Sequence, residues 1–237
     1  MQKIYVSSWL GIDFDSLPIE LSSRRIADSH FYEAFYEKFF SEVHSYKEIK
    51  DLAYIPRKQA ILNHLIQLTQ KEKKILSIGC GLGYLEYELS RKNNSLDIVA
   101  IDPGSASVFL QNTNIHVLKG FFPEVLNSNL NSFDFVFASS IDYAFTDTQY
   151  ENFLKSVVKF GIKKFLLTEI YLPQTDLISK IKLLLKETLI TLGVFKSGQF
   201  WGYNRTLDEH VIILKRAGFN SFELGNYDHS YWINAKV

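Results

Sequence analysis

The feature that most constrains the fold is a cluster of three glycines between an apolar run and a helical one. Residues 75–78 (ILSI) form a short apolar run that suits a buried strand, and Gly79, Gly81 and Gly83 follow at alternate positions. Residues 82–91 then repeat apolar side chains at helical intervals. Glycine lets a backbone turn tightly and approach a ligand, and the first turn of a helix offers N–H groups without partners. The sequence therefore predicts a strand, a ligand-accessible turn and a helix.

The alternation of strand and helix continues along the rest of the chain. Further strands are predicted at 96–101, 115–118, 133–138, 164–169, 219–224 and 231–237, and helices at 105–111, 148–160, 175–192 and 206–217. Strands that alternate with helices form a mostly parallel sheet covered on both faces. We read the helix over 175–192 as ordinary packing, with a lid or a homodimer contact left open.

The first 70 residues are expected to form an arm and a helical cap on this core. Residues 1–18 have no clear period, which favours an irregular arm or a short strand. A helix over 28–50 repeats phenylalanine every four residues, and a second helix is predicted over 57–70. We therefore divide the chain into 1–70 and a core of 71–237, with a helical insertion near 174–205.

Asp102 strengthens the case that the glycine turn binds a ligand. It ends the next predicted strand, where a carboxylate can accept hydrogen bonds from both hydroxyls of a ribose. The spacing G-x-G-x-x-G of dinucleotide-binding proteins fails in both registers, because Tyr84 or Glu86 stands at the third glycine position. The lysine of a phosphate-binding P-loop is also missing. These observations favour an adenosine-containing ligand that is neither a dinucleotide nor a nucleoside triphosphate.

These motifs resemble those of the class I S-adenosylmethionine-dependent methyltransferases, and the resemblance spans roughly residues 74–237. ILSIGCGLG is similar to the first motif of that family, AIDPG to its second acidic position, and FDFVFASSIDYAF to its fourth strand. The resemblance implies an α/β fold of the Rossmann-like type. Its doubly wound, mostly parallel, seven-stranded sheet would carry an antiparallel C-terminal strand pair and an N-terminal helical extension. It also implies S-adenosylmethionine as the cofactor.

The resemblance further implies which residues hold that cofactor. The glycines would approach its methionine and ribose portions, Asp102 would hold the ribose, and residues 120–122 would lie against the adenine. The full expected set is Ser77, Gly79, Cys80, Gly81, Gly83, Asp102, Pro103, Gly120, Phe121, Phe122, Ser139 and Ser140. The chain departs from the family at Ser77, where an acidic residue is common, and at Phe121 and Phe122, where aromatic contact could replace a polar partner of the adenine.

The acceptor side offers candidates without a distinctive spacing. Methyl transfer depends on in-line positioning, and a base is needed only when the acceptor must lose a proton. The catalytic candidates are Asp142, Tyr143 and His210, and Glu169 is a further candidate. A loop or helix-cap role is preferred for Asp142, and a solvated or core-edge position for His210. The candidates for acceptor binding are Tyr32, Tyr36, Glu169, Trp201, Tyr203 and Arg205, the last three from a predicted exposed loop whose structural role stays open.

The charge and cysteine content of the chain limit the functional classes to which it can belong. The chain has 26 basic and 26 acidic residues, so no net field attracts nucleic acid or an anionic membrane. Cys80 is the only cysteine, which excludes an intramolecular disulfide and a multi-cysteine metal site. The N-terminus lacks the pattern of a secretory signal, and lysines interrupt the apolar stretch 178–195. We expect a cytoplasmic protein with no membrane insertion and no bound metal.

The sequence favours transfer of a methyl group to an oxygen or nitrogen of a small molecule, such as a sugar or a specialised metabolite. The alternative is a catalytically silent methyltransferase-like subunit that supports a partner, to which Ser77 gives weight and Asp102 does not. A dinucleotide oxidoreductase is poorly supported because of the glycine register.

Overall fold

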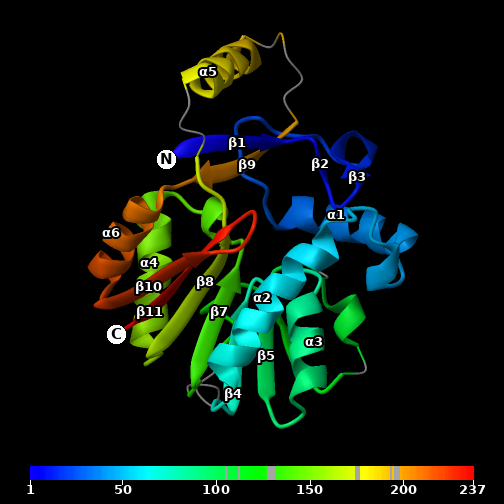
Figure 1. Cartoon of the computed structure of the whole chain (residues 1–237). Helices are drawn as coiled ribbons and strands as arrows, with labels where there is room; N and C mark the ends of the chain where they lie inside the picture. The colour runs from blue at the N-terminus through cyan, green and yellow to red at the C-terminus, as the bar shows by residue number, and fades with distance from the viewer. Residues whose placement is uncertain (105, 112, 127–131, 174–176, 193, 195–197) are drawn as a thin grey trace.

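The computed structural model describes the chain except residues 105, 112, 127–131, 174–176, 193 and 195–197. Its centre is a seven-stranded sheet in the order β10-β11-β8-β7-β4-β5-β6 (Figure 1). Five strands are parallel: β4 (Lys74–Ile78), β5 (Asp97–Asp102), β6 (His116–Lys119), β7 (Phe135–Ser139) and β8 (Lys164–Ile170). β11 (Tyr231–Lys236) is antiparallel both to β8 and to β10 (Ser221–Asn226). The predicted fold class is confirmed.

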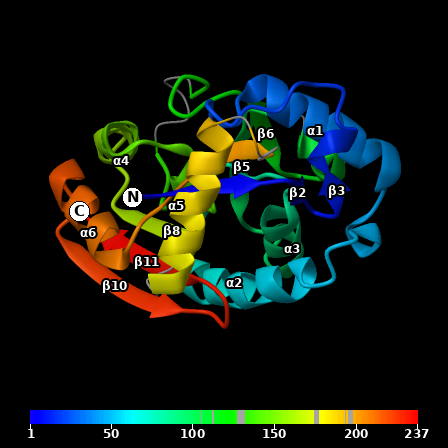
Figure 2. The same cartoon turned by 90° about the horizontal axis from the view of Figure 1, so that it is seen from above.

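Helices cover both faces of this sheet (Figure 2). α2 (Tyr54–Thr69) and α3 (Tyr84–Lys92) pack on one face, and α4 (Asp147–Lys159) and α6 (Leu207–Ala217) on the other. Side chains alternate between faces along a strand, so Ile75 joins the first core and its neighbour Leu76 the second. Because both faces are covered, the central strands are buried at nearly every position.

The order of strands reverses between β4 and β7. From β4 the chain adds β5 and β6 on one side and then returns to add β7 and β8 on the other. In open α/β sheets, ligands bind outside the carboxyl ends of the strands at such a reversal. The turn after β4 and the loop after β7, with its short helix η5 (Asp142–Ala144), therefore border the expected binding site.

The N-terminal segments lie over this edge of the sheet. β1 (Gln2–Val6) pairs with β9 (Gln199–Asn204), and β2 (Ser8–Trp9) pairs with β3 (Ile12–Asp13). α1 (Ser29–Glu42) begins after Asp28, whose side chain accepts a hydrogen bond from the Phe31 amide. Phe31, Phe35 and Phe39 of α1 are buried in the core that α2 and α3 share. Other short helices among the described residues are η1 (Phe14–Ser16), η2 (Tyr46–Glu48) and η3 (Ala106–Leu110).

Two predictions about the segments between β8 and α6 are wrong. The segment around Trp201 is not an exposed loop but strand β9, and Trp201 is buried. Its pairing partner lies nearly 200 residues away in β1, so no local pattern reveals it. The packing interpretation of α5 (Leu177–Thr191) also fails, because Ile178, Ile181 and Leu185 are exposed and the helix stands above the β1–β9 pair (Figure 1).

The predicted helix over 28–50 is shorter than expected. α1 ends at Glu42, and Val43 is already extended.

Within the described residues, no helix has the length and apolar character that crossing a membrane requires.

Candidate functional site

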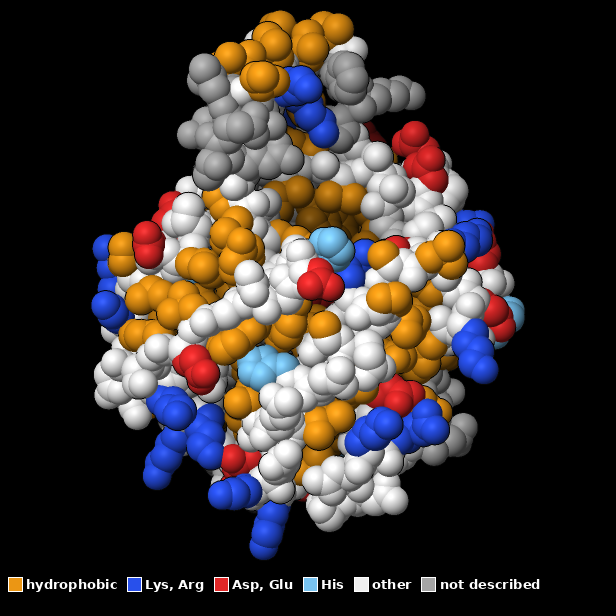
Figure 3. All heavy atoms as spheres, in the orientation of Figure 1, with side chains coloured by type: hydrophobic (Ala, Val, Ile, Leu, Met, Phe, Trp, Pro, Cys, Tyr) orange, Lys and Arg blue, Asp and Glu red, His pale blue; other side chains and the backbone are white. Residues whose placement is uncertain are grey.

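A cavity of about 800 Å³ lies at the carboxyl ends of β4 and β7, below the N-terminal segments. In Figure 3 it is visible as a hollow lined by hydrophobic side chains below the projecting top of the molecule. Its volume lies within the range of about 300–1,000 Å³ that holds cofactor-sized and drug-sized ligands. The strand reversal and the cavity therefore coincide.

Glycine is required at the three positions of the turn for different reasons. Gly79, Gly81 and Gly83 all have left-handed φ values, of 74°, 55° and 74°. A Cβ on Gly79 would lie 2.3 Å from Ile141, and one on Gly83 would lie 2.6 Å from Leu110, so close packing demands glycine at both positions. Gly81 lines the cavity, and a Cβ there would make only an ordinary contact, 3.6 Å from the Tyr36 hydroxyl oxygen, whereas Gly83 precedes α3 and does not line it.

Asp102 ties this turn to the end of β5. Its Oδ2 accepts the Gly81 N–H at 2.9 Å, and its Oδ1 accepts the Gly104 N–H at 2.8 Å. Burial raises the pKa of the Asp102 carboxyl to about 6, although both hydrogen bonds act in the opposite direction. Each carboxylate oxygen can accept a second hydrogen bond. The Asp102 side chain, which lines the cavity, can therefore still accept hydroxyl groups of a ligand.

A polar cluster of Lys58, Ser139 and Glu169 forms another part of the wall. The Ser139 hydroxyl donates to Glu169 Oε2 at 2.7 Å, and Lys58 Nζ forms an ion pair with the same carboxylate. Burial acts to raise the pKa of Glu169, but the Lys58 ammonium and the two hydrogen bonds outweigh it, and the pKa is lowered. Ser140 and Glu169 have φ values of 53° and 59°, which are uncommon in residues with a Cβ and occur at functional sites.

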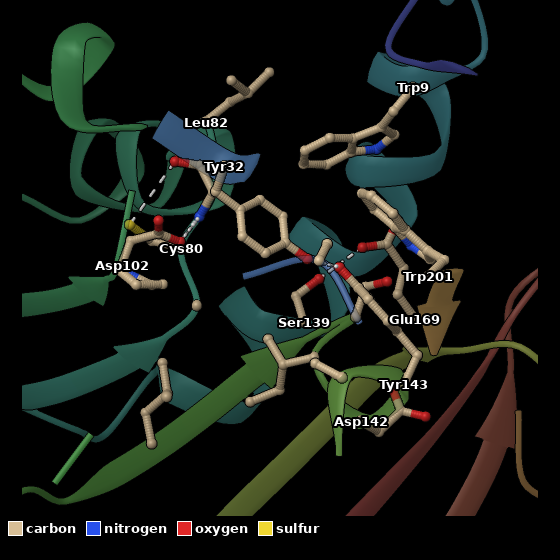
Figure 4. A pocket seen from close by; sticks show the side chains of 18 of the residues that line it. Trp9, Tyr32, Cys80, Leu82, Asp102, Ser139, Asp142, Tyr143, Glu169 and Trp201 are labelled. Carbon is tan, nitrogen blue, oxygen red and sulfur yellow. Dashed lines mark hydrogen bonds between the residues drawn. The ribbon is translucent and has the colours of Figure 1, made fainter. Parts of the chain in front are cut away.

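Aromatic side chains form the wall opposite the glycine turn (Figure 4). The hydroxyl oxygens of Tyr32 and Tyr143 point at each other and lie 3.0 Å apart. Tyr143 stacks on Trp201 with ring centroids 5.5 Å apart and planes inclined by 12°, and Trp9 packs edge-on against Trp201. Burial raises the pKa of Tyr32 to about 12, so this hydroxyl stays protonated near neutral pH. The wall offers flat apolar surfaces and two phenol groups.

Sixteen of the residues expected in the site do line this cavity: Tyr32, Tyr36, Gly79, Cys80, Gly81, Asp102, Pro103, Gly120, Phe121, Phe122, Ser139, Ser140, Asp142, Tyr143, Glu169 and Trp201. Five others do not: Ser77, Gly83, Tyr203, Arg205 and His210.

His210 and Asp142 face each other behind the cavity wall. His210 Nε2 lies 3.5 Å from Asp142 Oδ2, and its Nδ1 lies 3.2 Å from the Tyr150 hydroxyl. Burial lowers the pKa of His210 to about 3, so the ring is neutral at pH 7. Burial also raises the pKa of Asp142 to about 7. Although Asp142 lines the cavity, its carboxylate is directed at His210.

Arg205 has its partners inside the protein. The side chain is fully buried, and its guanidinium donates to Asp147 Oδ1 and to the Asp142 carbonyl, both at 2.8 Å. It also donates to the Phe145 carbonyl and lies 5.2 Å from the ring centre of Tyr150. These contacts hold the loop after β7 against the start of α6, so its position is explained without an acceptor.

Lys58 and Glu86 are among the charged residues on the cavity wall that were not expected from the sequence. Lys58 lies in α2 at helical spacing from the buried Tyr54 and Leu65, and Glu86 lies in α3 beside the buried Leu89. A charged residue on the apolar face of an amphipathic helix is the signal that could have found them. Among the described residues, no group of three His, Cys, Asp or Glu is placed to hold a metal ion.

Solved structures with a similar fold include several methyltransferases. The chain is 17% identical to human N-acetylserotonin methyltransferase in complex with SAM (TM-score 0.58; 88% of this chain, 56% of that one). It is 18% identical to the N,N-8-amino-8-demethyl-D-riboflavin dimethyltransferase from Streptomyces davawensis (TM-score 0.57; 84% and 61%). It is 12% identical to magnesium protoporphyrin IX methyltransferase from Synechocystis PCC 6803 with bound SAH (TM-score 0.57; 87% and 96%).

The chain therefore shares its fold with these methyltransferases, as the sequence motifs predicted. In five solved structures with this fold, the chain spans only 53–61% of the length of the other protein. The amino-acid sequence itself matches no family model and no curated protein.

Proposed function

We propose that this cavity binds S-adenosylmethionine and that the protein transfers its methyl group to an oxygen or nitrogen of a small-molecule acceptor. One observation carries the proposal: Gly81 and Asp102 meet through a 2.9 Å hydrogen bond in one cavity at the strand reversal. The close approach that Gly81 permits suits the cofactor backbone, and the free lone pairs of Asp102 suit ribose hydroxyls.

The charges on the wall support a cationic ligand. Arg57 is paired with Asp51 and Lys58 with Glu169, whereas Asp102 and Glu86 have no ion-pair partner within the described residues. Carboxylates without cations attract a sulfonium and repel the phosphates of a dinucleotide. The solved methyltransferases that carry SAM or SAH add support from the fold.

The residues of the chain act mainly by positioning. The bound cofactor supplies a methyl group on a positively charged sulfur, which is itself the leaving group. Trp201 and Tyr143 offer stacked surfaces to hold a flat acceptor, and the Tyr32 and Tyr143 hydroxyls can orient it. We assign Asp142 and His210 to holding the loop that carries Tyr143, because they face each other behind the wall.

Calorimetry with S-adenosylmethionine and NAD tests the cofactor. We expect Asp102→Asn to weaken S-adenosylmethionine binding at least tenfold, about 1.4 kcal/mol, because it removes a charged acceptor of the ribose hydroxyls. The matched control is Asp97→Asn at the exposed start of the same strand, which should bind as the unchanged protein does. Equal affinity of both variants would remove Asp102 from the site, and preferential binding of NAD would overturn the proposal.

Incubation with methyl-labelled cofactor and a cell extract then tests catalysis. A labelled small molecule would support methyl transfer and identify the acceptor. Tight cofactor binding without any labelled product across extracts would instead favour the catalytically silent alternative.

A further inference from the structure

Position 77 is the place where the chain departs from the motif it otherwise matches. Ser77 lies in β4, two residues before Gly79, and it is fully buried without lining the cavity. Its hydroxyl donates to the carboxylate of Glu86. Ser77 therefore offers nothing to a ligand directly, but it orients a group that does reach the cavity.

Glu86 brings a second carboxylate to the glycine turn, from α3. It lies in the first turn of α3, is only 2% exposed, and lines the cavity. Both acids act electrostatically on Cys80 in the turn. Burial raises the pKa of the Cys80 thiol, and the negative charges of Asp102 and Glu86 raise it further. The two carboxylates therefore act on the same turn, one from the β5 side and one from α3.

The Glu86 carboxylate lacks the cation that a buried acid needs. Among the described residues, no lysine, arginine or histidine lies within 4.0 Å of it. Lys58 acts on it only from a longer distance, and that ammonium is already paired with Glu169. A buried carboxylate without a partner is destabilising, and a cation from outside would relieve the cost.

We propose that Glu86 binds the ammonium group of the methionine portion of S-adenosylmethionine, oriented by Ser77. The assignment rests on the proposed function. The methyltransferase motif commonly has an acidic residue at position 77, and Glu86 would supply the carboxylate that Ser77 lacks. The ammonium would favour the ionised form of Glu86, so the hydrogen bond between them would be charge-assisted.

Two ligands separate this contact from the rest of the site. S-Adenosylhomocysteine carries the amino-acid group, whereas 5′-methylthioadenosine has the same adenosine and thioether without it. We expect Glu86→Gln to weaken S-adenosylhomocysteine binding at least tenfold and to change 5′-methylthioadenosine binding by less than twofold, as measured by calorimetry. Glu88→Gln, the same change two residues along α3 and outside the cavity, is the matched control.

A double variant tests whether the carboxylate can return to position 77. Ser77→Asp combined with Glu86→Gln should recover S-adenosylhomocysteine affinity to within about threefold of the unchanged protein. Thermal melting checks that each variant is folded; in the single variant Glu86→Gln, the amide oxygen of the new side chain can still accept the Ser77 hydroxyl.

The outcomes are distinct. An unchanged S-adenosylhomocysteine affinity in Glu86→Gln would overturn the assignment, and so would an equal loss for both ligands. If the unchanged protein binds neither ligand, the proposed function fails first and the assignment falls with it.

Discussion

At the scale of single residues, three acids in the cavity wall share one property. Burial raises the pKa of Glu86 to about 7, of Asp102 to about 6 and of Asp142 to about 7. An acid whose pKa is higher in the folded chain than in the unfolded chain holds its proton longer in the folded state. As the pH rises from about 4 to 7, the unfolded chain binds fewer protons, so these acids lower the stability of the folded state.

Glu86→Gln should therefore stabilise the protein while weakening its ligand binding. The penalty on Glu86 begins above its ordinary pKa of 4.5 and is complete above about 7. The gain in the free energy of unfolding should be on the order of 2 kcal/mol larger at pH 8 than at pH 5. Urea unfolding at the two pH values measures it. A gain that does not depend on pH would show that Glu86 is already neutral or already paired.

Sequence reasoning reached part of this site. The glycines and Asp102 were found because their positions depend on local order: a strand, a turn and the tip of the next strand. Glu86 and Lys58 were missed because a charged residue in a helix is exposed by default. Both side chains are shielded from water because α1 and β1 pack over α2 and α3. No local sequence pattern encodes that packing.

At the scale of elements, β9 controls the aromatic wall. Gly202 lies in the middle of this strand with φ 145°, and a Cβ there would lie 2.0 Å from the Tyr143 carbonyl oxygen. The strand and the loop after β7 therefore touch backbone to backbone. This contact brings Trp201 and Tyr143 into their stacked arrangement.

Gly202→Ala should cost more stability than the same change at Gly161. Both glycines have positive φ, but a Cβ on Gly161 meets nothing within 4 Å. Gly161→Ala should lower the free energy of unfolding by about 1 kcal/mol from backbone strain alone. Gly202→Ala adds a collision with backbone and should lose at least about 2 kcal/mol more. Similar urea midpoints for the two variants would contradict the close contact.

The elements that could be predicted well are those in which apolar residues recur at a regular spacing within the element itself. The sheet strands and the helices around them were placed to within a few residues, because burial on one or both faces leaves a pattern of apolar residues. β9 has no such pattern: QFWGYN includes a glycine, and its pairing with β1 is set by long-range contact. α5 has the pattern without the burial, so its apolar side chains were wrongly assigned to packing.

At the scale of the whole molecule, α5 stands clear of the body that the sheet and its helices form. Its side chains Ile181, Leu184 and Leu185 are each about half exposed or more. Side chains that remain in contact with water contribute little to folding. The apolar surface of α5 is therefore separate from the two cores that hold the domain together.

A triple change of Ile181, Leu184 and Leu185 to glutamine should leave the free energy of unfolding within about 0.5 kcal/mol of its original value. Leu65→Ala in the buried face of α2 gives the scale, since removing a fully buried leucine costs about 2–5 kcal/mol. Urea unfolding at low protein concentration makes the comparison. If the triple variant lost as much free energy of unfolding as Leu65→Ala, the apolar side chains of α5 would have to be packed against other parts of the protein in solution.

The pairing of β1 with β9 also determines at what point during translation the binding site can be completed. β9, the partner of β1, is translated roughly 190 residues after it. At about 5–20 residues per second, β1 waits roughly 10–40 s without its neighbour. During that interval the glycine turn and Asp102 can form on the nascent chain, but the β1–β9 pair cannot. Tight capture of a ligand therefore has to wait until β9 has been translated.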